Sequence, residues 1–127
     1  MKIQRIFNDK AGESHMEVIE WIETREEFSE GSPSIDMTQF IPASRVAIIT
    51  ASVGWKGAWH ATPKRQLMFY LAGSAKRETS DGSIHDMNPG TITLLEDIDG
   101  KGHRSWVVGD SEVVIALVQL DSDEIVL

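Results

Sequence analysis

The eight residues Trp59-His60-Ala61-Thr62-Pro63-Lys64-Arg65-Gln66 decide how the rest of the chain is interpreted. They place a histidine, a threonine and a glutamine at short intervals, and strand-forming runs lie on both sides of them. Gly73 closes the segment that follows, and a second histidine, His103, ends a later segment that begins at Gly90. If these segments are strands, two histidines and an amide from different strands meet in a small polar site inside an apolar barrel.

Short apolar or alternating runs, separated by turn residues, occupy most of the chain. Many short strands with regular turns and almost no helical periodicity predict an all-β fold, an antiparallel sandwich or barrel. The Asp81-Gly82 pair predicts a tight hairpin turn with positive φ. The expected strands are residues 2–7, 14–21, 36–40, 45–53, 59–62, 66–72, 75–79, 84–87, 91–95, 102–108, 112–120 and 124–127.

Three segments carry more specific predictions. Residues 45–53 form a strongly apolar run, which is typical of a strand buried on both faces or nearly so. Thr24 and Glu27 have the Thr-x-x-Glu spacing of a capping box, which predicts one short helical turn. Residues 2–7 are predicted to lie at a sheet edge, where they would pair across a two-fold axis and form a homodimer.

The composition excludes several classes of protein. The chain has 127 residues, about the size of one domain, and no repeat or linker divides it, so we expect one domain over residues 1–127. The formal net charge of −8 argues against nucleic-acid and membrane partners. The absence of cysteine excludes disulfides and thiolate metal sites. No apolar run reaches about 18 residues and no export leader follows Met1, so we expect a soluble cytoplasmic protein.

The spacing of the opening stretch resembles the first motif of the cupin family. That motif reads Gly-x5-His-x-His-x3-4-Glu-x6-Gly, and this chain has Gly54, His60, Thr62, Gln66 and Gly73 at the matching positions. A Pro-Gly turn at residues 89–90, followed by a short strand and the histidine at 103, resembles the second motif. The resemblance covers roughly residues 45–120, with N-terminal strands at 2–40. It implies a small single-domain RmlC-like cupin, a double-stranded β-helix or jelly-roll barrel, with a degenerate metal motif.

The resemblance also implies a ligand set for a divalent metal ion, namely Zn, Ni, Mn or Fe. His60, Gln66 and His103 match three of the four family ligands, and Thr62 stands where the second histidine should be. Two imidazoles and an amide leave the charge of the metal uncompensated, and first-row ions prefer at least one carboxylate at such sites. Glu96, Asp97 or a bound substrate would have to supply the anion, so a metal-free site is an equal alternative. No organic cofactor is expected.

The candidate site residues fall into two groups. Without a metal, an imidazole of the two histidines would act as general base, since histidine titrates near neutral pH. An arginine at the cavity mouth would suit a carboxylate-bearing ligand. The predicted catalytic residues are His60, His103 and Tyr70, and the predicted pocket residues are Thr62, Met68, Arg65, Trp59 and Asp97. Each also has a structural interpretation, such as a loop cap for the aspartate or core packing for the tryptophan.

Two functions from different classes remain open at this point. One is an enzyme of lyase or isomerase type that acts on a small polar or carboxylated metabolite. The other is a non-catalytic barrel that binds or senses a small ligand without a metal. The missing histidine and carboxylate favour the binding barrel over an ordinary oxidative cupin. The lack of a DNA-binding segment or output domain argues against the binding barrel. A homodimer is also what the family resemblance implies.

Overall fold

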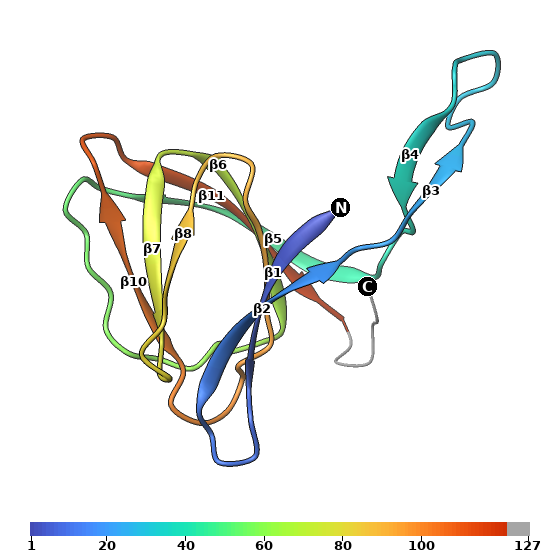
Figure 1. Cartoon of the computed structure of the whole chain (residues 1–127). Helices are drawn as coiled ribbons and strands as arrows, with labels where there is room; N and C mark the ends of the chain where they lie inside the picture. The colour runs from blue at the N-terminus through green and yellow to red at the C-terminus, as the bar shows by residue number, and fades with distance from the viewer. Residues whose placement is uncertain (122–127) are drawn as a thin grey trace.

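A computed structural model describes residues 1–121, in which eleven strands and no helix occur. Two sheets face each other, one of six strands and one of three, and a separate pair of strands extends from the body (Figure 1). The strands are β1 (Lys2–Asn8), β2 (Ser14–Glu20), β3 (Glu23–Glu26), β4 (Ile35–Thr38), β5 (Ala43–Ala51), β6 (Gln66–Ala72), β7 (Ser74–Thr79), β8 (Ile84–Met87), β9 (Ile92–Leu95), β10 (His103–Val108) and β11 (Val113–Leu120). The predicted all-β jelly-roll architecture is confirmed.

The strand order is β2-β1-β9-β6-β11-β5 in the large sheet and β10-β7-β8 in the small one. All neighbours pair antiparallel except β1 and β9, which run parallel with Gln4 opposite Thr93. The predicted hairpin joins β7 to β8, and Gly82 in its turn has φ of 90°. The long jumps between neighbours bring residues from distant parts of the chain into one barrel.

The large sheet buries apolar side chains on both of its faces. Side chains alternate along a strand, so successive residues of β6 point to opposite faces. Tyr70 belongs to a cluster between the two sheets, together with Val107 and Ile115. Leu67 belongs to a second cluster on the outer face of the large sheet, with Trp21 among its members. The inner cluster surrounds the cavity described below.

The prediction for residues 45–53 is correct about the strand and wrong about its burial. β5 covers nearly this segment, yet it lies at the edge of the large sheet and pairs with β11 alone among the described residues. Val46 is 70% exposed and Ile48 is 62% exposed. Burial within residues 1–121 therefore does not account for the apolar composition of this strand.

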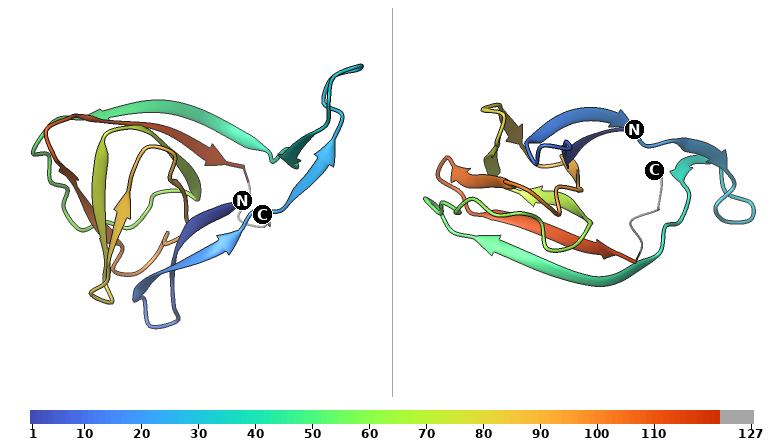
Figure 2. Two further views of the ribbon diagram at one scale, coloured as in Figure 1. Left: turned by 45° about the horizontal axis from the view of Figure 1, so that its top comes forward. Right: turned by 90° about the horizontal axis from the view of Figure 1, so that it is seen from below.

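Three further local predictions are wrong. The capping-box segment is β3, and Thr24 Oγ1 donates to Glu26 Oε1 at 3.0 Å instead of capping a helix. β3 pairs with β4 to form a two-stranded arm that points away from the barrel (Figure 2). Residues 59–62 form no strand and make only an isolated bridge at His60. Residues 2–7 are not an edge, since β2 and β9 occupy the two sides of β1.

Two remaining expectations concern the strand at residues 124–127 and membrane-spanning segments. The expected strand at 124–127 lies outside the described residues. Over residues 1–121, no helix that could cross a membrane is found.

Candidate functional site

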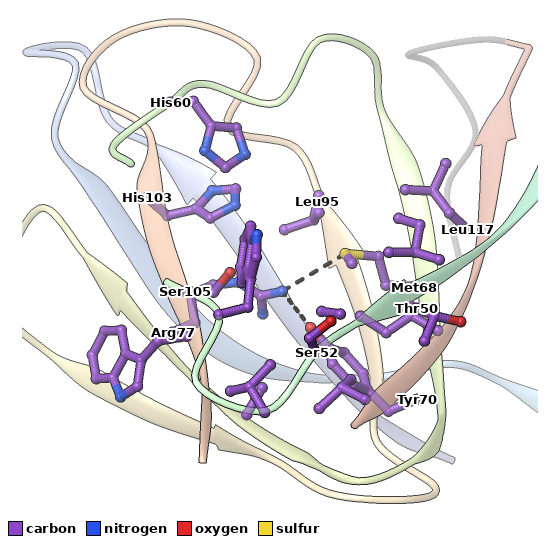
Figure 3. A pocket seen from close by; sticks show the side chains of 18 of the residues that line it. Thr50, Ser52, His60, Met68, Tyr70, Arg77, Leu95, His103, Ser105 and Leu117 are labelled. Atoms are coloured by element: carbon purple, nitrogen blue, oxygen red, sulfur yellow. Dashed lines mark hydrogen bonds between the residues drawn. The ribbon is translucent and has the colours of Figure 1, made fainter. Parts of the chain in front are cut away.

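A cavity of about 340 Å³ lies between the two sheets, inside the barrel. Its wall comes from strands of both sheets and from the loop that precedes β6 (Figure 3). Trp55 and His60, both exposed to solvent, line it on the loop side, whereas Tyr70, Arg77 and His103 line it and are buried. The cavity therefore opens beside the loop and reaches polar groups in the interior.

A chain of hydrogen bonds from Thr62 through Asp97 fixes the orientation of the buried His103. Thr62 Oγ1 donates to Asp97 Oδ1 at 2.7 Å, and His103 Nδ1 donates to Asp97 Oδ2 at 2.6 Å. The backbone N–H of Thr62 also donates to the carbonyl of Asp97 at 3.0 Å. Thr62 and Asp97 are 1% and 0% exposed. Because a carboxylate can only accept, the Nδ1 of neutral His103 carries the proton and Nε2 keeps its lone pair.

Burial dominates the protonation of His103. It lowers the pKa of the imidazole below its ordinary value of 6.5, because the imidazolium would lose hydration. The hydrogen bond to Asp97 opposes this effect, and the positive charge of Arg77 adds to the lowering. His103 is accordingly neutral at pH 7 and is able to accept a proton.

His60 is held against His103 by backbone and ring contacts. The two residues exchange backbone hydrogen bonds of 3.0 and 2.9 Å, and their ring centroids are 4.7 Å apart. His60 Nδ1 donates to the carbonyl of Ala58 at 2.9 Å, which leaves its Nε2 with a lone pair as well. Gly102 makes this approach possible, since a Cβ there would lie 2.0 Å from the carbonyl oxygen of His60.

Arg77 brings a positive charge into the cavity. It stands on β7, the central strand of the small sheet, and is 1% exposed. Its Nη2 donates to the hydroxyl of Tyr70 at 2.9 Å and approaches the sulfur of Met68 at 3.8 Å, as the dashed lines in Figure 3 show. Since Tyr70 accepts this bond, its own proton remains available as a donor.

The donor set does not fit a divalent metal ion on its own. Two features favour a metal, because each histidine donates through Nδ1 and leaves Nε2 free, and Gln66 Oε1 is buried without a donor. These three ligands are all neutral, however, and the Arg77 guanidinium lines the same cavity. Within residues 1–121 no group of three His, Asp or Glu side chains is arranged to hold a metal. A divalent cation would add positive charge to a cavity whose wall already holds the positive charge of Arg77.

The structure divides the predicted site residues into two sets. Those that line the cavity are His60, Gln66, Met68, Tyr70 and His103. Thr62 and Asp97 lie behind the wall and act on the cavity only through His103. Thr62 thus supports the carboxylate that orients one histidine, at the position where the family places another histidine.

Two predicted pocket residues are placed elsewhere. Arg65 is buried outside the cavity wall and pairs with Glu96 at 2.5 Å. Trp59 is 42% exposed and lies under the guanidinium of Arg104, 5.0 Å from the ring centroid. The tryptophans that do line the cavity are Trp55 and Trp106.

The arginine of the cavity is Arg77, which the sequence analysis did not single out. Parity along β7 could have found it, because Ala75, Arg77 and Thr79 alternate with more exposed residues and point inward together. A basic residue on the inward side of a short strand is unusual, since charged side chains are rarely buried without a partner.

Comparisons with known proteins give the fold and nothing finer. No family model and no curated protein matches the chain. A cupin domain from Bordetella pertussis Tohama I is similar in structure, with a TM-score of 0.51 and 16% identity over 80% of this chain and 93% of that one. KdgF from a Halomonas species is similar with a TM-score of 0.50 and 16% identity, over 81% of this chain and 91% of that one.

A third similar structure is that of a much longer chain. The DMSP lyase DddQ from Ruegeria pomeroyi DSS-3 has a TM-score of 0.51 and 15% identity over 77% of this chain, which corresponds to 46% of the lyase. Identities this low establish a common fold and carry no activity with them. The strand order, the facing sheets and these likenesses agree with the motif spacing, and the chain therefore has the fold of a small cupin.

Proposed function

We propose that the barrel binds a small polar metabolite in its cavity and catalyses proton transfer on it, as a lyase or isomerase does. The observation that carries this proposal is the hydrogen-bonded chain from Thr62 through Asp97 to His103. It leaves a neutral imidazole with one bare nitrogen in the wall of the cavity, and an unprotonated nitrogen is what a general base requires.

The geometry supports a proton transfer without a metal. Nε2 of His103 takes a proton from a carbon next to a carbonyl, and the electron pair of that bond moves onto the carbonyl oxygen. Asp97 stabilises the imidazolium that forms, because its carboxylate accepts from Nδ1. Tyr70 has a hydroxyl proton to donate to the developing oxyanion, since its oxygen accepts from Arg77. Nε2 then returns the proton to another carbon or to a leaving group.

The metal-dependent form is the first alternative. It would use His60, Gln66 and His103 as ligands, and a bound metal would polarise a carbonyl or hydroxyl oxygen. Elemental analysis of protein purified without an affinity tag separates the two forms. Near-stoichiometric Zn, Ni, Mn or Fe in the parent, lost in both His60→Ala and His103→Ala, would establish the metal form and overturn the metal-free one.

A non-catalytic binding barrel is the second alternative, and it would use the same cavity. Incorporation of solvent deuterium into small carbonyl and hydroxy compounds, followed by nuclear magnetic resonance, distinguishes binding from proton transfer. We expect exchange with the wild type and none with His103→Gln. His15→Gln serves as the control, because His15 pairs with Asp9 and Asp81 and none of these three residues lines the cavity. Binding without exchange in every compound would establish the non-catalytic barrel. A cytoplasmic location is part of the same proposal.

A further inference from the structure

We infer that the ligand of the cavity is a small hydroxycarboxylate, whose carboxylate binds Arg77 and whose hydroxyl donates to Gln66. This inference rests on the cavity being the functional site, as proposed above. It is carried by two buried polar atoms without hydrogen-bond partners, Arg77 Nε and Gln66 Oε1.

Among residues 1–121 the guanidinium of Arg77 has only uncharged acceptors. Its Nη2 reaches Tyr70 and Met68, its Nη1 reaches Thr93 Oγ1 at 3.5 Å, and its Nε reaches none. Over residues 1–121 the one fully buried carboxylate is Asp97, which already accepts from a threonine and a histidine. A buried charge without a counterion destabilises a folded chain unless something compensates it. A ligand carboxylate supplies that charge and matches the planar donors of a guanidinium.

A second buried arginine shows that the chain can pair such a residue when its role is structural. Arg65 is 5% exposed, and its Nε donates to Glu96 Oε2 at 2.5 Å. Glu96 also accepts from Arg5. Arg77 is more deeply buried than Arg65 and has no comparable partner within the described residues. Arg77 lines the cavity, and no carboxylate within residues 1–121 forms an ion pair with it.

The orphan oxygen of Gln66 refines the ligand class. An amide oxygen accepts hydrogen bonds, so its partner is a hydroxyl or an ammonium group and not a second carboxylate. The positive charge of Arg77 on the same cavity wall disfavours an ammonium. A volume of about 340 Å³ lies near the lower end of the usual range for ligand sites, which limits the ligand to a small metabolite.

A matched ligand series tests the inference by nuclear magnetic resonance titration of the protein. The probes are hydroxycarboxylates of three to six carbons, each with the carboxylate that lacks the hydroxyl and the diol that lacks the carboxylate. We expect the hydroxycarboxylates to bind tightest and the diols weakest, with shifts at the cavity residues. Diols that bind as tightly as the carboxylates would overturn the anion site and leave the cavity proposal standing. If no compound of any class shifts the cavity residues, both proposals fail.

Two arginine variants give an independent readout. Arg77→Met should weaken carboxylate binding about thirtyfold or more, since it removes one partner of a buried charge pair. Its unfolding midpoint in urea should be unchanged or higher, because an uncompensated buried charge has been removed. Arg65→Met is the matched control and should lower the midpoint while binding persists. A lowered midpoint for Arg77→Met together with retained carboxylate binding would show a structural arginine and overturn the inference.

A different observation carries a second proposal, which concerns the surface of β5. The outer cluster of the large sheet is buried near Leu67 and continues into exposed apolar residues at the β5 edge. Val46, Ile48 and Leu71 are 70%, 62% and 55% exposed on this side of the barrel. Among residues 1–121 no strand pairs with the outer edge of β5, so this edge adds backbone groups without a strand partner to the same surface. Such an edge is a site for pairing with another chain.

The arm of residues 22–41 has the complementary properties. Its two strands pair only with each other among residues 1–121, and an isolated two-stranded sheet is at best marginally stable in water. It exposes Phe28 and Phe40, at 66% and 87%. Its charged residues are five carboxylates and one arginine: Glu23, Glu26, Glu27, Glu30, Asp36 and Arg25. β5, by contrast, carries Arg45 and no carboxylate, and Lys64 donates to Ser44 on it.

We propose that a second copy of the chain covers both surfaces, with the arm of each protomer against β5 of the other. A two-fold arrangement buries both surfaces at once and brings the acidic arm to the basic strand. The homodimer predicted from the sequence would thus form through β5 and the arm, since β1 has no free edge.

Light scattering at micromolar concentration tests the dimer. The wild type should have twice the mass of one chain, and Ile48→Lys and Phe40→Ser should each give a monomer. Ile84→Lys is the matched control, because Ile84 is 55% exposed on β8 of the other sheet. A monomeric wild type would overturn the proposal. Dimers that persist in both variants would overturn the proposed interface.

Discussion

The carboxylate of Asp97 accepts a hydrogen bond of 2.6 Å from His103 Nδ1, although the two residues are only 0% and 3% exposed. The same carboxylate accepts from Thr62, so neither oxygen lacks a donor. Asp97 thereby joins Thr62 to His103, the first residue of β10, behind the cavity. The hydrogen bond between Asp97 and His103 orients the imidazole and determines that the proton of the neutral ring lies on Nδ1.

Replacement of Asp97 by asparagine should reduce the free energy of unfolding by about 1–3 kcal/mol, the range for removing a buried hydrogen-bonded partner. The amide can present an oxygen to Thr62 or to His103, and its NH₂ group then opposes a donor. Urea unfolding measures the change. Asp99→Asn is the control in the same loop, since Asp99 is exposed, and it should leave the stability unaltered. Equal stability of both variants would show that the buried pair contributes nothing.

His103 and His15 should have pKa values on opposite sides of the ordinary histidine pKa. Burial lowers the pKa of His103, whereas hydrogen bonds from His15 to Asp9 and Asp81 raise the pKa of His15. Nuclear magnetic resonance of the imidazole protons should therefore give a midpoint below 6.5 for His103 and above 6.5 for His15. The reverse order would contradict the description of the site.

The same shift has a consequence for stability against pH. Folding lowers the pKa of His103, so protonation of this histidine disfavours the folded state. Its contribution to stability is fully present above about pH 6.5, the ordinary pKa of a histidine in the unfolded chain. That stabilisation is lost as the pH falls from this value through the lowered pKa in the folded state. The decrease in unfolding free energy over this window should be smaller in His103→Gln than in the wild type. A parallel decrease in both proteins would show that other groups cause it.

Gly102→Ala should damage the site more than an ordinary glycine substitution. Gly102 and Gly109 have similar φ of 70° and 79°, but a Cβ at Gly109 would meet nothing within 4 Å. Gly109→Ala should thus lose about 1–2 kcal/mol for its left-handed backbone alone. At Gly102 the carbonyl of His60 must also move, which would break the His60–His103 bridge. Equal losses in urea unfolding would show that the close approach is not needed.

The motif spacing predicted the barrel and the histidine pair well, because glycine turns and strand parity are local properties of the sequence. The burial of residues 45–53 was predicted wrongly, because an apolar composition is also compatible with an exposed strand at the edge of the sheet. The first strand of the arm, β3, was mistaken for a helical turn, because the spacing of Thr24 and Glu27 also occurs in strands. Its pairing with β4 makes the segment a strand.

The site itself was only half predictable. Asp97 was as easily explained by its glycine-rich loop, and its contact with Thr62 depends on a fold that brings residues 35 apart in sequence together. The alternation along β7 could have predicted that Arg77 points inward, but no sequence motif identifies a buried arginine as part of a site. Its significance appears only when its partners are counted in three dimensions.

The acid–base proposal depends on whether His103 presents a bare Nε2 to the cavity. The nitrogen chemical shifts of its ring, measured at neutral pH on protein with labelled histidine, report this directly. We predict a pyrrole-type shift at Nδ1, with its proton bonded to Asp97, and a pyridine-type shift at Nε2. A protonated Nε2 at neutral pH, as imidazolium or as the other tautomer, would contradict the proposal.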